Sequence, residues 1–303
     1  MNWKYKAFLQ QIFSLIPFGE NLNYWCQKKL TKSLPAKLPD FTKKIDEAKK
    51  HLEVFNKYNY QGGENAVFYE FGAGQDLIIP LIFYSFGIPK QILTDIRSLV
   101  RIELINHTIN LFKKINPEPA IKRIPCRYLN GKTKKECLAQ LKRYYGIEYL
   151  APCDGRSTGL KPNSVNFITS TNTLEHIPSR DIQAILKECY RLLKPGNFMS
   201  FIIDYCDHYS YFDKSISVYN FLRYPALVWK LFNSSLHYQN RLRHRDYLNL
   251  IKSAGFEISE ESIGEPVKDD IGKMKNIPLA EVFKKRYKPN ELIPQCSHLI
   301  LKK

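Results

Sequence analysis

The chain is poor in acidic residues and lacks the features of cross-linked or membrane-spanning proteins. It has 303 residues, with 29 Asp and Glu against 46 Lys and Arg, and a formal net charge of +17. Its seven cysteines are scattered and include no Cys-x-x-Cys pair, so neither a disulfide framework nor a zinc cluster is expected, and no metal site is predicted. No apolar run reaches the roughly 18 residues that span a bilayer. These absences favour a soluble protein of a reducing compartment, and we expect a cytoplasmic location.

No internal repeat and no RNA-binding signature is visible, so the hypothesis of a nucleic-acid partner depends on the net charge alone. The charge is concentrated between Lys113 and Arg143, where ten Lys and Arg stand against two Glu. The turn residues in this stretch predict a surface insertion. Two interpretations remain open, a solvated basic face or a site for a phosphate-rich partner such as RNA, anionic lipid or a lipid-linked sugar.

The first 18 residues superficially resemble a signal peptide, but Gln10 and Gln11 interrupt the apolar stretch and no small-residue cleavage site follows. The spacing predicts an amphipathic helix instead. Its apolar residues are expected to pack on the body of the protein, with a membrane surface as the alternative. They are Phe8, Leu9, Ile12, Phe13, Leu15 and Ile16.

The most informative pattern is an apolar run from Val67 that ends in Glu70 and continues through Gly72 and Gly74. Glycines after a strand let the backbone approach a nucleotide-like ligand. A second apolar run ends in Asp95, 21 residues after Gly74, where a carboxylate can accept from both hydroxyls of a ribose. Together the two runs predict a site for an adenosine-containing cofactor.

The glycine turn lacks the third glycine of the dinucleotide fingerprint, because Asp76 follows Gly74 after one residue. A carboxylate at the start of a helix disfavours a pyrophosphate, which prefers the positive end of the helix dipole. The turn therefore favours a cofactor without phosphates.

With these motifs the sequence resembles the class I S-adenosylmethionine-dependent methyltransferases, especially their small-molecule branch, the type 11 methyltransferase domain. The resemblance continues through Cys153-Asp154-Gly155, the Ser164 to Ser170 run, Asn172-Thr-Leu-Glu-His176, and the Lys194-Pro-Gly196 turn. Four motifs in the family's order cover about residues 64 to 206.

The resemblance implies S-adenosylmethionine as cofactor and a role for each matching residue. The methionine part would lie on Glu70 and the turn from Gly72 to Gly74, and the adenosine part on Asp95 and Ile96. The resemblance also implies that Asp154 and Gly155 bind the adenine, and that Asn172 lies beside the methionine amino group or the methyl. Each of these residues is also common as a helix-cap or turn residue. The prediction therefore depends on all of them occurring together in the order typical of the family.

The expected fold is a Rossmann-like doubly wound α/β sheet of about seven mostly parallel strands, with helices on both faces. The resemblance implies that the last strand is antiparallel. We expect an N-terminal helical extension or cap over 1–63 and a methyltransferase domain over 64–303, with insertions near 116–145 and 206–243. The predicted strands fall near 66–71, 90–95, 147–151, 164–170, 198–205, 256–263 and 295–302.

The acceptor should lie over the loops after the fourth and fifth strands, because ligands bind at the carboxyl ends of such sheets. His208 is the first candidate for a general base, followed by His237 and His176. Candidate substrate-binding residues are Asp207, Tyr209, Tyr238 and Arg241, and Arg243 is a further candidate clamp for an acidic acceptor. The aromatic stretch from Tyr219 to Phe232 is interpreted as a lid or a lipid-facing surface.

These patterns favour a methyltransferase acting on a small-molecule or glycan-type acceptor, through oxygen. Three alternatives remain: an RNA methyltransferase, a nicotinamide oxidoreductase, and a non-catalytic peripheral-membrane protein with a vestigial site. The missing third glycine argues against the oxidoreductase. The sequence predicts no oligomeric state.

Overall fold

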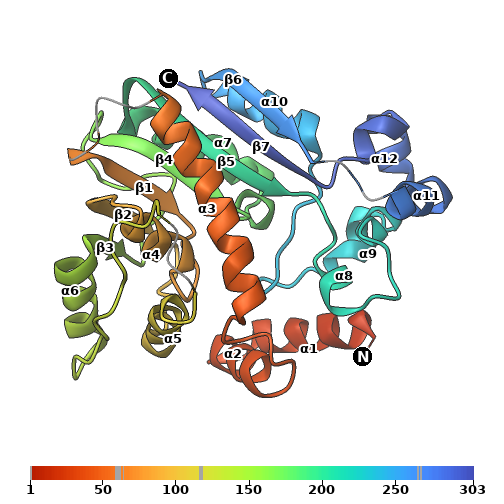
Figure 1. Cartoon of the computed structure of the whole chain (residues 1–303). Coiled ribbons are helices and arrows are strands. Elements are labelled where there is room, and N and C mark those ends of the chain that lie inside the picture. The colour runs from red at the N-terminus through yellow and green to blue at the C-terminus, as the bar shows by residue number, and fades with distance from the viewer. Residues whose placement is uncertain (1, 59–62, 64, 116–118, 265, 267) are drawn as a thin grey trace.

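Three helices precede the sheet in the computed structural model, which describes residues 2–58, 63, 65–115, 119–264, 266 and 268–303. They are α1 (Trp3–Leu15), α2 (Gly19–Lys29) and α3 (Leu38–Tyr58). The breaks between them fall at Pro17 and around Pro35, as the sequence predicts. Figure 1 shows α1 and α2 side by side at one end of the molecule, while α3 runs along the sheet.

The sheet has seven strands in the order β3-β2-β1-β4-β5-β7-β6. The neighbouring strands from β3 to β5 pair in parallel, and β7 pairs antiparallel with both β5 and β6. This confirms the predicted fold, including the antiparallel last strand. The strands are β1 (Val67–Phe71), β2 (Lys90–Thr94), β3 (Ile147–Leu150), β4 (Val165–Thr171), β5 (Leu193–Asp204), β6 (Glu257–Ile263) and β7 (Cys296–Lys302).

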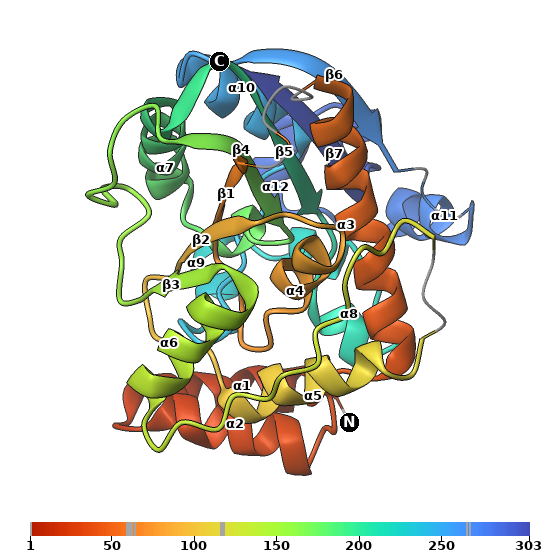
Figure 2. The same cartoon turned by 60° about the vertical axis from the view of Figure 1, so that its left-hand side comes forward.

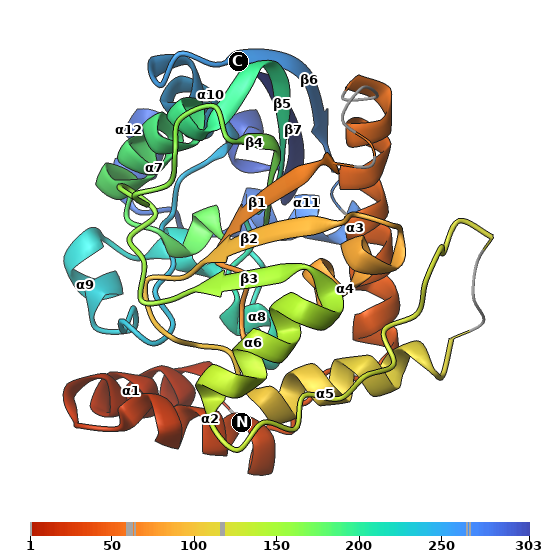
Figure 3. The ribbon, with the colours of Figure 1, turned by 90° about the vertical axis from the view of Figure 1, so that its left-hand side faces the viewer.

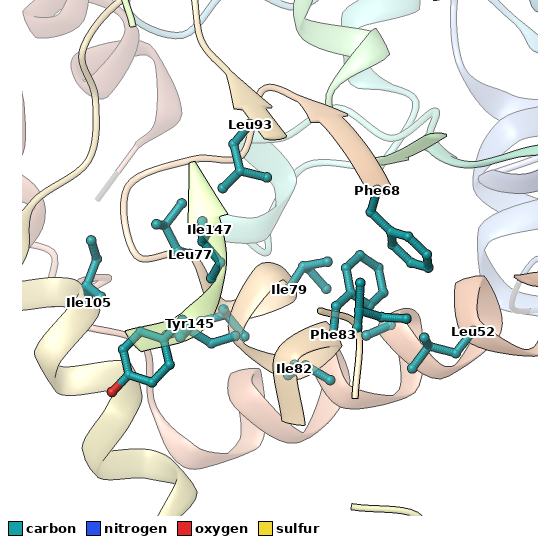
Figure 4. Close-up of a cluster of buried hydrophobic side chains, with 14 of the residues drawn as sticks. Leu52, Phe68, Leu77, Ile79, Ile82, Phe83, Leu93, Ile105, Tyr145 and Ile147 are labelled. Carbon is teal, nitrogen blue, oxygen red and sulfur yellow. The ribbon is translucent and has the colours of Figure 1, made fainter. Parts of the chain in front are cut away.

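Helices α3, α4 (Ile78–Ser85), α5 (Ile102–Phe112) and α6 (Lys134–Tyr145) contribute to one face of the sheet. Figures 2 and 3 show these helices around the near strands, and Figure 4 shows the core between them. There Phe68 and Leu93 of the strands lie with Leu52 of α3 and Phe83 of α4. Helix α3 shares its core with the sheet, although the expected extension over 1–63 includes it; that domain boundary stays a prediction.

The other face is covered by α7 (Ser179–Leu192) and α10 (His244–Ser253). Successive strand residues point to opposite faces, so Phe68 and Tyr69 enter different cores. Because both faces are covered, the central strands are almost continuously buried rather than alternating between buried and exposed residues. The carboxyl edge of this sheet is thereby held rigidly between two helical layers.

A third apolar core joins segments that lie far apart in the chain. We call residues 2–37, 206–243 and 268–295 the cap. Trp3 of α1 packs against Tyr209 and Phe232 with ring centroids 5.3 and 4.9 Å apart, and its backbone nitrogen donates to Asp213 at 2.9 Å. The remaining elements of the cap are α8 (Tyr209–Phe212), η3 (Asn220–Arg223), α9 (Ala226–Lys230), α11 (Lys268–Asn276), α12 (Glu281–Arg286) and η4 (Pro289–Leu292).

Two expectations about surfaces are wrong. The stretch from Tyr219 to Phe232 is neither a lid nor a lipid-facing surface as a whole, because Tyr219, Phe221 and Trp229 are buried in the core of the cap. The basic segment is also more than a surface insertion, because α6 buries Leu141 and Tyr145 against the sheet.

The predicted packing of α1 is reversed. Trp3, Ala7 and Gln10 form its buried side, and the apolar residues expected to pack inward are exposed on the opposite side, except Phe13, which is half-buried. Those exposed are Phe8, Leu9, Ile12, Leu15 and Ile16. Periodicity identifies an apolar face but does not say whether the protein covers it. Among the described residues, no helix combines the length and the apolar character that crossing a bilayer requires.

Candidate functional site

Two pockets lie at the carboxyl edge of the sheet and share Gly72 and Thr173 in their walls. The glycine-turn pocket has a volume of about 390 Å³ and the Asp95 pocket about 270 Å³. All eight residues predicted to bind the cofactor line one or both of them: Glu70, Gly72, Gly74, Asp95, Ile96, Asp154, Gly155 and Asn172. The structure thus brings the whole predicted set together, and their individual roles in binding stay predictions.

The two glycines of the turn are needed for different reasons. Both have positive φ, 75° at Gly72 and 79° at Gly74. A Cβ at Gly72 would lie 2.3 Å from Cγ2 of Thr173, so packing alone demands a glycine there. A Cβ at Gly74 would meet no heavy atom within 4 Å, so this backbone faces open space in the pocket.

Glu70 is the second-last residue of β1 and is buried, and its Oε2 has no hydrogen-bond partner among the described residues. Burial, together with the charge of Asp95, raises the pKa of Glu70 to about 8, although Lys44 opposes the shift. Lys44 of α3 lines the same pocket, as do Gln27 and Ser33. Sequence reasoning missed these three because they precede the motifs and no local pattern marks them.

Asp95 follows β2 and is 5% exposed. The hydroxyl of Tyr149 donates to its Oδ2 at 2.8 Å, which sequence reasoning also missed. Burial raises the pKa of Asp95 to about 7, against the opposing effects of Tyr149 and Arg97. Ile96 beside it is 63% exposed and forms part of the pocket wall, as a surface for a planar ring requires.

Asp154 lines the Asp95 pocket, but its carboxylate is already occupied. Nε of Arg156 donates to both oxygens at 3.0 Å, and these bonds lower the pKa of Asp154. Arg156 also pairs with Asp181 of α7 at 2.8 Å. Arg156 lines the pocket itself and was not singled out from the sequence. At Gly155 a Cβ would have ordinary contacts, the nearest at 3.6 Å to Ile185, so space there does not demand a glycine.

Asn172 follows β4 with a φ of 52°, and its Nδ2 donates to Oε1 of Glu47 at 3.3 Å. The chain then forms the short turn η2 (Leu174–His176). Nδ2 of Asn240 donates to the carbonyls of Leu174 and Ile177 at 2.8 Å, which ties the turn to the cap.

The three candidate histidines meet beside this turn, although they come from different segments. The ring centroids of His176 and His208 are 4.8 Å apart, and those of His208 and His237 are 6.2 Å apart. Burial and the neighbouring His208 lower the pKa of His176 to about 4, so its ring is neutral near pH 7. His176 also lines the Asp95 pocket, which places the group next to the cofactor residues.

Three of the four predicted substrate-binding residues, Asp207, Tyr209 and Arg241, make hydrogen bonds within the cap. Asp207 is fully buried and accepts from Nδ2 of Asn220 and the backbone nitrogen of Tyr209, both at 2.9 Å. The hydroxyl of Tyr209 donates to the carbonyl of Phe232 at 2.7 Å. None of the four lines either of the two pockets: Asp207, Tyr209, Tyr238 and Arg241.

The two arginines are engaged in the same way. Arg241 donates to the carbonyl of Phe221 at 2.9 Å, and the fully buried Arg243 donates to the carbonyls of Tyr205 and Leu292 at 2.7 and 2.9 Å. Arginines that satisfy backbone carbonyls in a core are not free to clamp an acidic ligand. Arg243 is therefore a structural residue, and the substrate role of Arg241 has no support in this geometry.

A family model described as a methyltransferase domain matches residues 119–201. The match agrees with the strand order and with the resemblance seen in the sequence, and both support a class I methyltransferase fold. No curated protein matches the sequence.

Several solved structures are similar at low sequence identity. A geranyl diphosphate C-methyltransferase from Streptomyces coelicolor has 10% identity and a TM-score of 0.48, with 85% of this chain and 76% of the other covered. A phosphoethanolamine N-methyltransferase from Haemonchus contortus has 14% identity and a TM-score of 0.46, with 84% of this chain and 52% of the other covered. A methyltransferase from Archaeoglobus fulgidus has 12% identity and a TM-score of 0.44, over 86% and 94%.

The residues present fit S-adenosylmethionine. The two pockets are adjacent, with Gly72 and Thr173 in the walls of both, which suits one elongated ligand that spans them. The unpartnered Oε2 of Glu70 suits a cationic group, and the open space at Gly74 admits a ligand close to the backbone. The carboxylate of Asp95 and the exposed side chain of Ile96 suit a ribose and a flat base.

Proposed function

We propose that this protein, which has the class I methyltransferase fold, transfers a methyl group from S-adenosylmethionine to an oxygen of a small-molecule or glycan-type acceptor. The observation that carries the proposal is the pair of adjacent pockets lined by all eight predicted cofactor residues. An RNA acceptor has only the net charge in its favour. The seven free cysteines agree with a reducing, cytoplasmic location.

When bound, S-adenosylmethionine supplies an electrophilic methyl group on a sulfonium. The chain's own task is to hold donor and acceptor in line, because alignment removes much of the barrier to a displacement. Asp95 and Ile96 fix the adenosine end, while Glu70 and the glycine turn fix the methionine end. His176 lines the Asp95 pocket, and its imidazole, which is neutral near pH 7, can accept the proton of an acceptor hydroxyl.

Calorimetric titration tests the donor. The wild-type protein is titrated with S-adenosylmethionine, S-adenosylhomocysteine and NAD, and Asp95→Ala is compared with Asp46→Ala, an exposed position on α3. We expect the two sulfur compounds to bind, at least about a hundredfold more weakly to Asp95→Ala, because hydrogen bonds to a charged group contribute about 1.5–3 kcal/mol each. Asp46→Ala should match the wild type. Binding of NAD alone, or of none of the three, contradicts the proposal.

We further propose that α1 and α2 dock on an anionic membrane surface. The outward side of α1 exposes Phe8 at 63% and Leu15 at 77%, and Phe18 and Trp25 add exposed apolar surface around it. Contiguous exposed apolar residues of this size mark an interaction surface. Residues 2–37 contain six lysines and one acidic residue, Glu20, which pairs with Arg97. Basic side chains around an apolar face suit anionic headgroups above a hydrocarbon layer.

Docking would also bring the site close to the membrane, because Gln27, Ser33 and Leu34 of the same segment line the glycine-turn pocket. An acceptor with a lipid anchor could then reach the pocket without leaving the bilayer. This supports lipid-linked sugars and phosphate-bearing lipids as acceptor classes.

Co-sedimentation with vesicles tests the docking. We expect the protein to bind vesicles with 30% phosphatidylserine. The double variant Phe8→Ser/Leu15→Ser should bind at least about a hundredfold more weakly, because each substitution removes an apolar side chain that the membrane would bury, at about 1.5–3 kcal/mol each. Ile124→Ser/Val282→Ser, at exposed apolar positions elsewhere, should bind as the wild type does. Light scattering measures the oligomeric state and so tests the alternative, that the apolar face binds a second copy of this chain. A wild-type dimer abolished by Phe8→Ser/Leu15→Ser, or no vesicle binding, would show that the face does not serve a membrane.

A further inference from the structure

Glu175, His176 and His208 bring one ligand atom each to within 4.8 Å of one another. Glu175 and His176 belong to the turn η2 after β4, and His208 follows β5 and opens α8. Because β4 and β5 are parallel neighbours, their carboxyl ends place these side chains at the same edge of the sheet. A carboxylate and two imidazoles at this spacing have the composition of a divalent-metal site.

Glu175 is the strongest sign of a missing ligand. Its side chain is 98% buried, and neither carboxylate oxygen has a hydrogen-bond partner among the described residues. A buried carboxylate without partners is costly, and native structures rarely retain one without an ion, a water or a function. Asp204 adds a second carboxylate at the edge of the group, with its Oδ2 3.3 Å from Nε2 of His208.

His176 is oriented as metal-binding histidines are. Its Nδ1 lies 2.7 Å from the carbonyl oxygen of Tyr238, and a carbonyl only accepts, so Nδ1 carries the proton. Nε2 is then left with a lone pair. Fixing the ring through its other nitrogen is the usual support for a metal ligand. The backbone nitrogen of Asn240 also donates to the carbonyl of Glu175 at 2.7 Å, so both ligands of the turn are tied to the cap.

We propose that Glu175, His176 and His208 bind a divalent transition-metal ion that holds the acceptor oxygen. The acceptor part of this inference rests on the proposed methyl transfer. His176 lines the Asp95 pocket, and Thr173, two residues before Glu175, lines both pockets, so an ion here lies beside the junction at which the donor's methyl is expected. Three protein ligands leave coordination positions open for a substrate.

The chemistry of such a site balances without a further reactant. With the ion bound, His176 ligates the metal instead of acting as a base. A hydroxyl of the acceptor binds at an open position, and the metal lowers the pKa of the hydroxyl, so its proton leaves to solvent water. The oxygen's electron pair forms the bond to the methyl carbon. The bond from that carbon to sulfur breaks, and its electron pair stays on sulfur as S-adenosylhomocysteine. This chemistry selects acceptors with a hydroxyl, or two adjacent hydroxyls, as in sugars.

Direct metal binding tests the inference on the full-length protein after treatment with a chelator. Mn²⁺ is titrated while its free form is followed by electron paramagnetic resonance, and Zn²⁺ is titrated by calorimetry. We expect one equivalent to bind. Glu175→Gln and His208→Ala should each weaken binding at least about tenfold, since even residues that only support a ligand cost 10–100-fold. The control is His107→Ala, whose ring bonds the carbonyl of Ala36 at 2.9 Å away from the cluster, and it should bind as the wild type does.

Absence of binding at millimolar Mn²⁺ and Zn²⁺, or unchanged affinity in both site variants, would overturn the metal site. Glu175→Gln preserves the shape of the side chain but buries an amide. If that amide prevents folding, His208→Ala still tests the site. Circular dichroism shows which variants fold. Titration of the same samples with S-adenosylmethionine separates the two proposals. Donor binding without metal binding would remove only the metal site. Metal binding without donor binding would remove the methyl transfer, and with it the role of the metal in holding an acceptor, but would leave the metal site itself.

Discussion

The carboxyl edge of the sheet and the cap both concentrate polar side chains, but the two regions use them differently. At the sheet edge Glu70 and Glu175 are buried with oxygens that have no partner among the described residues. In the cap Asp207 and Arg243 are as deeply buried, yet Asp207 accepts from Asn220 and Tyr209. Arg243 donates to backbone carbonyls.

The comparison teaches which buried polar groups to associate with function. A group whose hydrogen bonds are made by the protein itself stabilises the fold, whereas a group left unpaired at a pocket awaits a ligand. By this criterion Glu70, which lines the glycine-turn pocket, and Glu175, whose neighbour His176 lines the Asp95 pocket, are candidates for function. Asp207 is a support, and so is Arg243, although its Nε has no hydrogen-bond partner among the described residues. Variants of the supports Asp207 and Arg243 should therefore change stability, and variants of Glu70 and Glu175 should change binding.

The largest effect should come from breaking a support in the cap. Arg243→Met leaves the carbonyls of Tyr205 and Leu292 buried without their donor, and should lower the free energy of unfolding by about 3 kcal/mol. Donor affinity should change less than about threefold, because Arg243 lines neither pocket. Urea unfolding and calorimetry measure the two quantities.

Arg180→Met is the matched control, because this side chain is 86% exposed, and it should cost less than about 0.5 kcal/mol. A stable Arg243→Met protein that fails to bind the donor would reverse the assignment of the cap as support.

The second effect is the pH dependence of donor affinity, which tests whether Glu70 is a functional group. Glu70 has a pKa of about 8 without a donor, so it is mostly protonated at pH 7. The donor's positive charge favours the ionised carboxylate, so binding below pH 8 should release a proton. Affinity should then rise with pH, approaching about tenfold per unit for this proton, and level off above pH 8.

Calorimetry in buffers of different ionisation enthalpy counts the released protons. Asp95, with a pKa of about 7, titrates in the same window, so the comparison of wild type with Glu70→Gln isolates the Glu70 contribution. Identical proton release in both proteins would show that Glu70 does not meet the charge of the donor.

The sheet and most cofactor residues could be predicted because their signals are local. An apolar run, a glycine and a terminal acid identify β1 with Gly72 and β2 with Asp95, and parallel pairing brings their ends together. The cap could not be predicted, because its core depends on contacts such as Trp3 with Tyr209, more than 200 residues apart. In the sequence alone, the polar residues of the 206–243 segment therefore look like ligands of a substrate.

The histidines show the same limit at the site itself. The sequence identified His176, His208 and His237 separately, but only the fold shows that they meet and that Glu175 joins them without a partner. The outward face of α1 is a further case. The apolar pattern of α1 can be seen in its own residues. Which side of the helix faces the protein depends instead on the contacts of Trp3 with Tyr209 and Phe232.

The smallest effect concerns Tyr149, a residue that supports a functional group rather than the fold. Its hydroxyl donates to Oδ2 of Asp95 and holds the pKa of that carboxyl down against burial. In Tyr149→Phe that pKa should rise. If it rises by about one unit from about 7, the ionised fraction at pH 7 falls from about a half to about a tenth, and donor affinity falls about fivefold. The loss should disappear at pH 9, where Asp95 is ionised in both proteins, whereas Asp95→Ala should stay weak at every pH. A loss in Tyr149→Phe that persists at pH 9 would mean that Tyr149 positions the pocket wall, for instance through the bond that the backbone nitrogen of Leu99 donates to its hydroxyl at 3.1 Å, rather than the charge of Asp95.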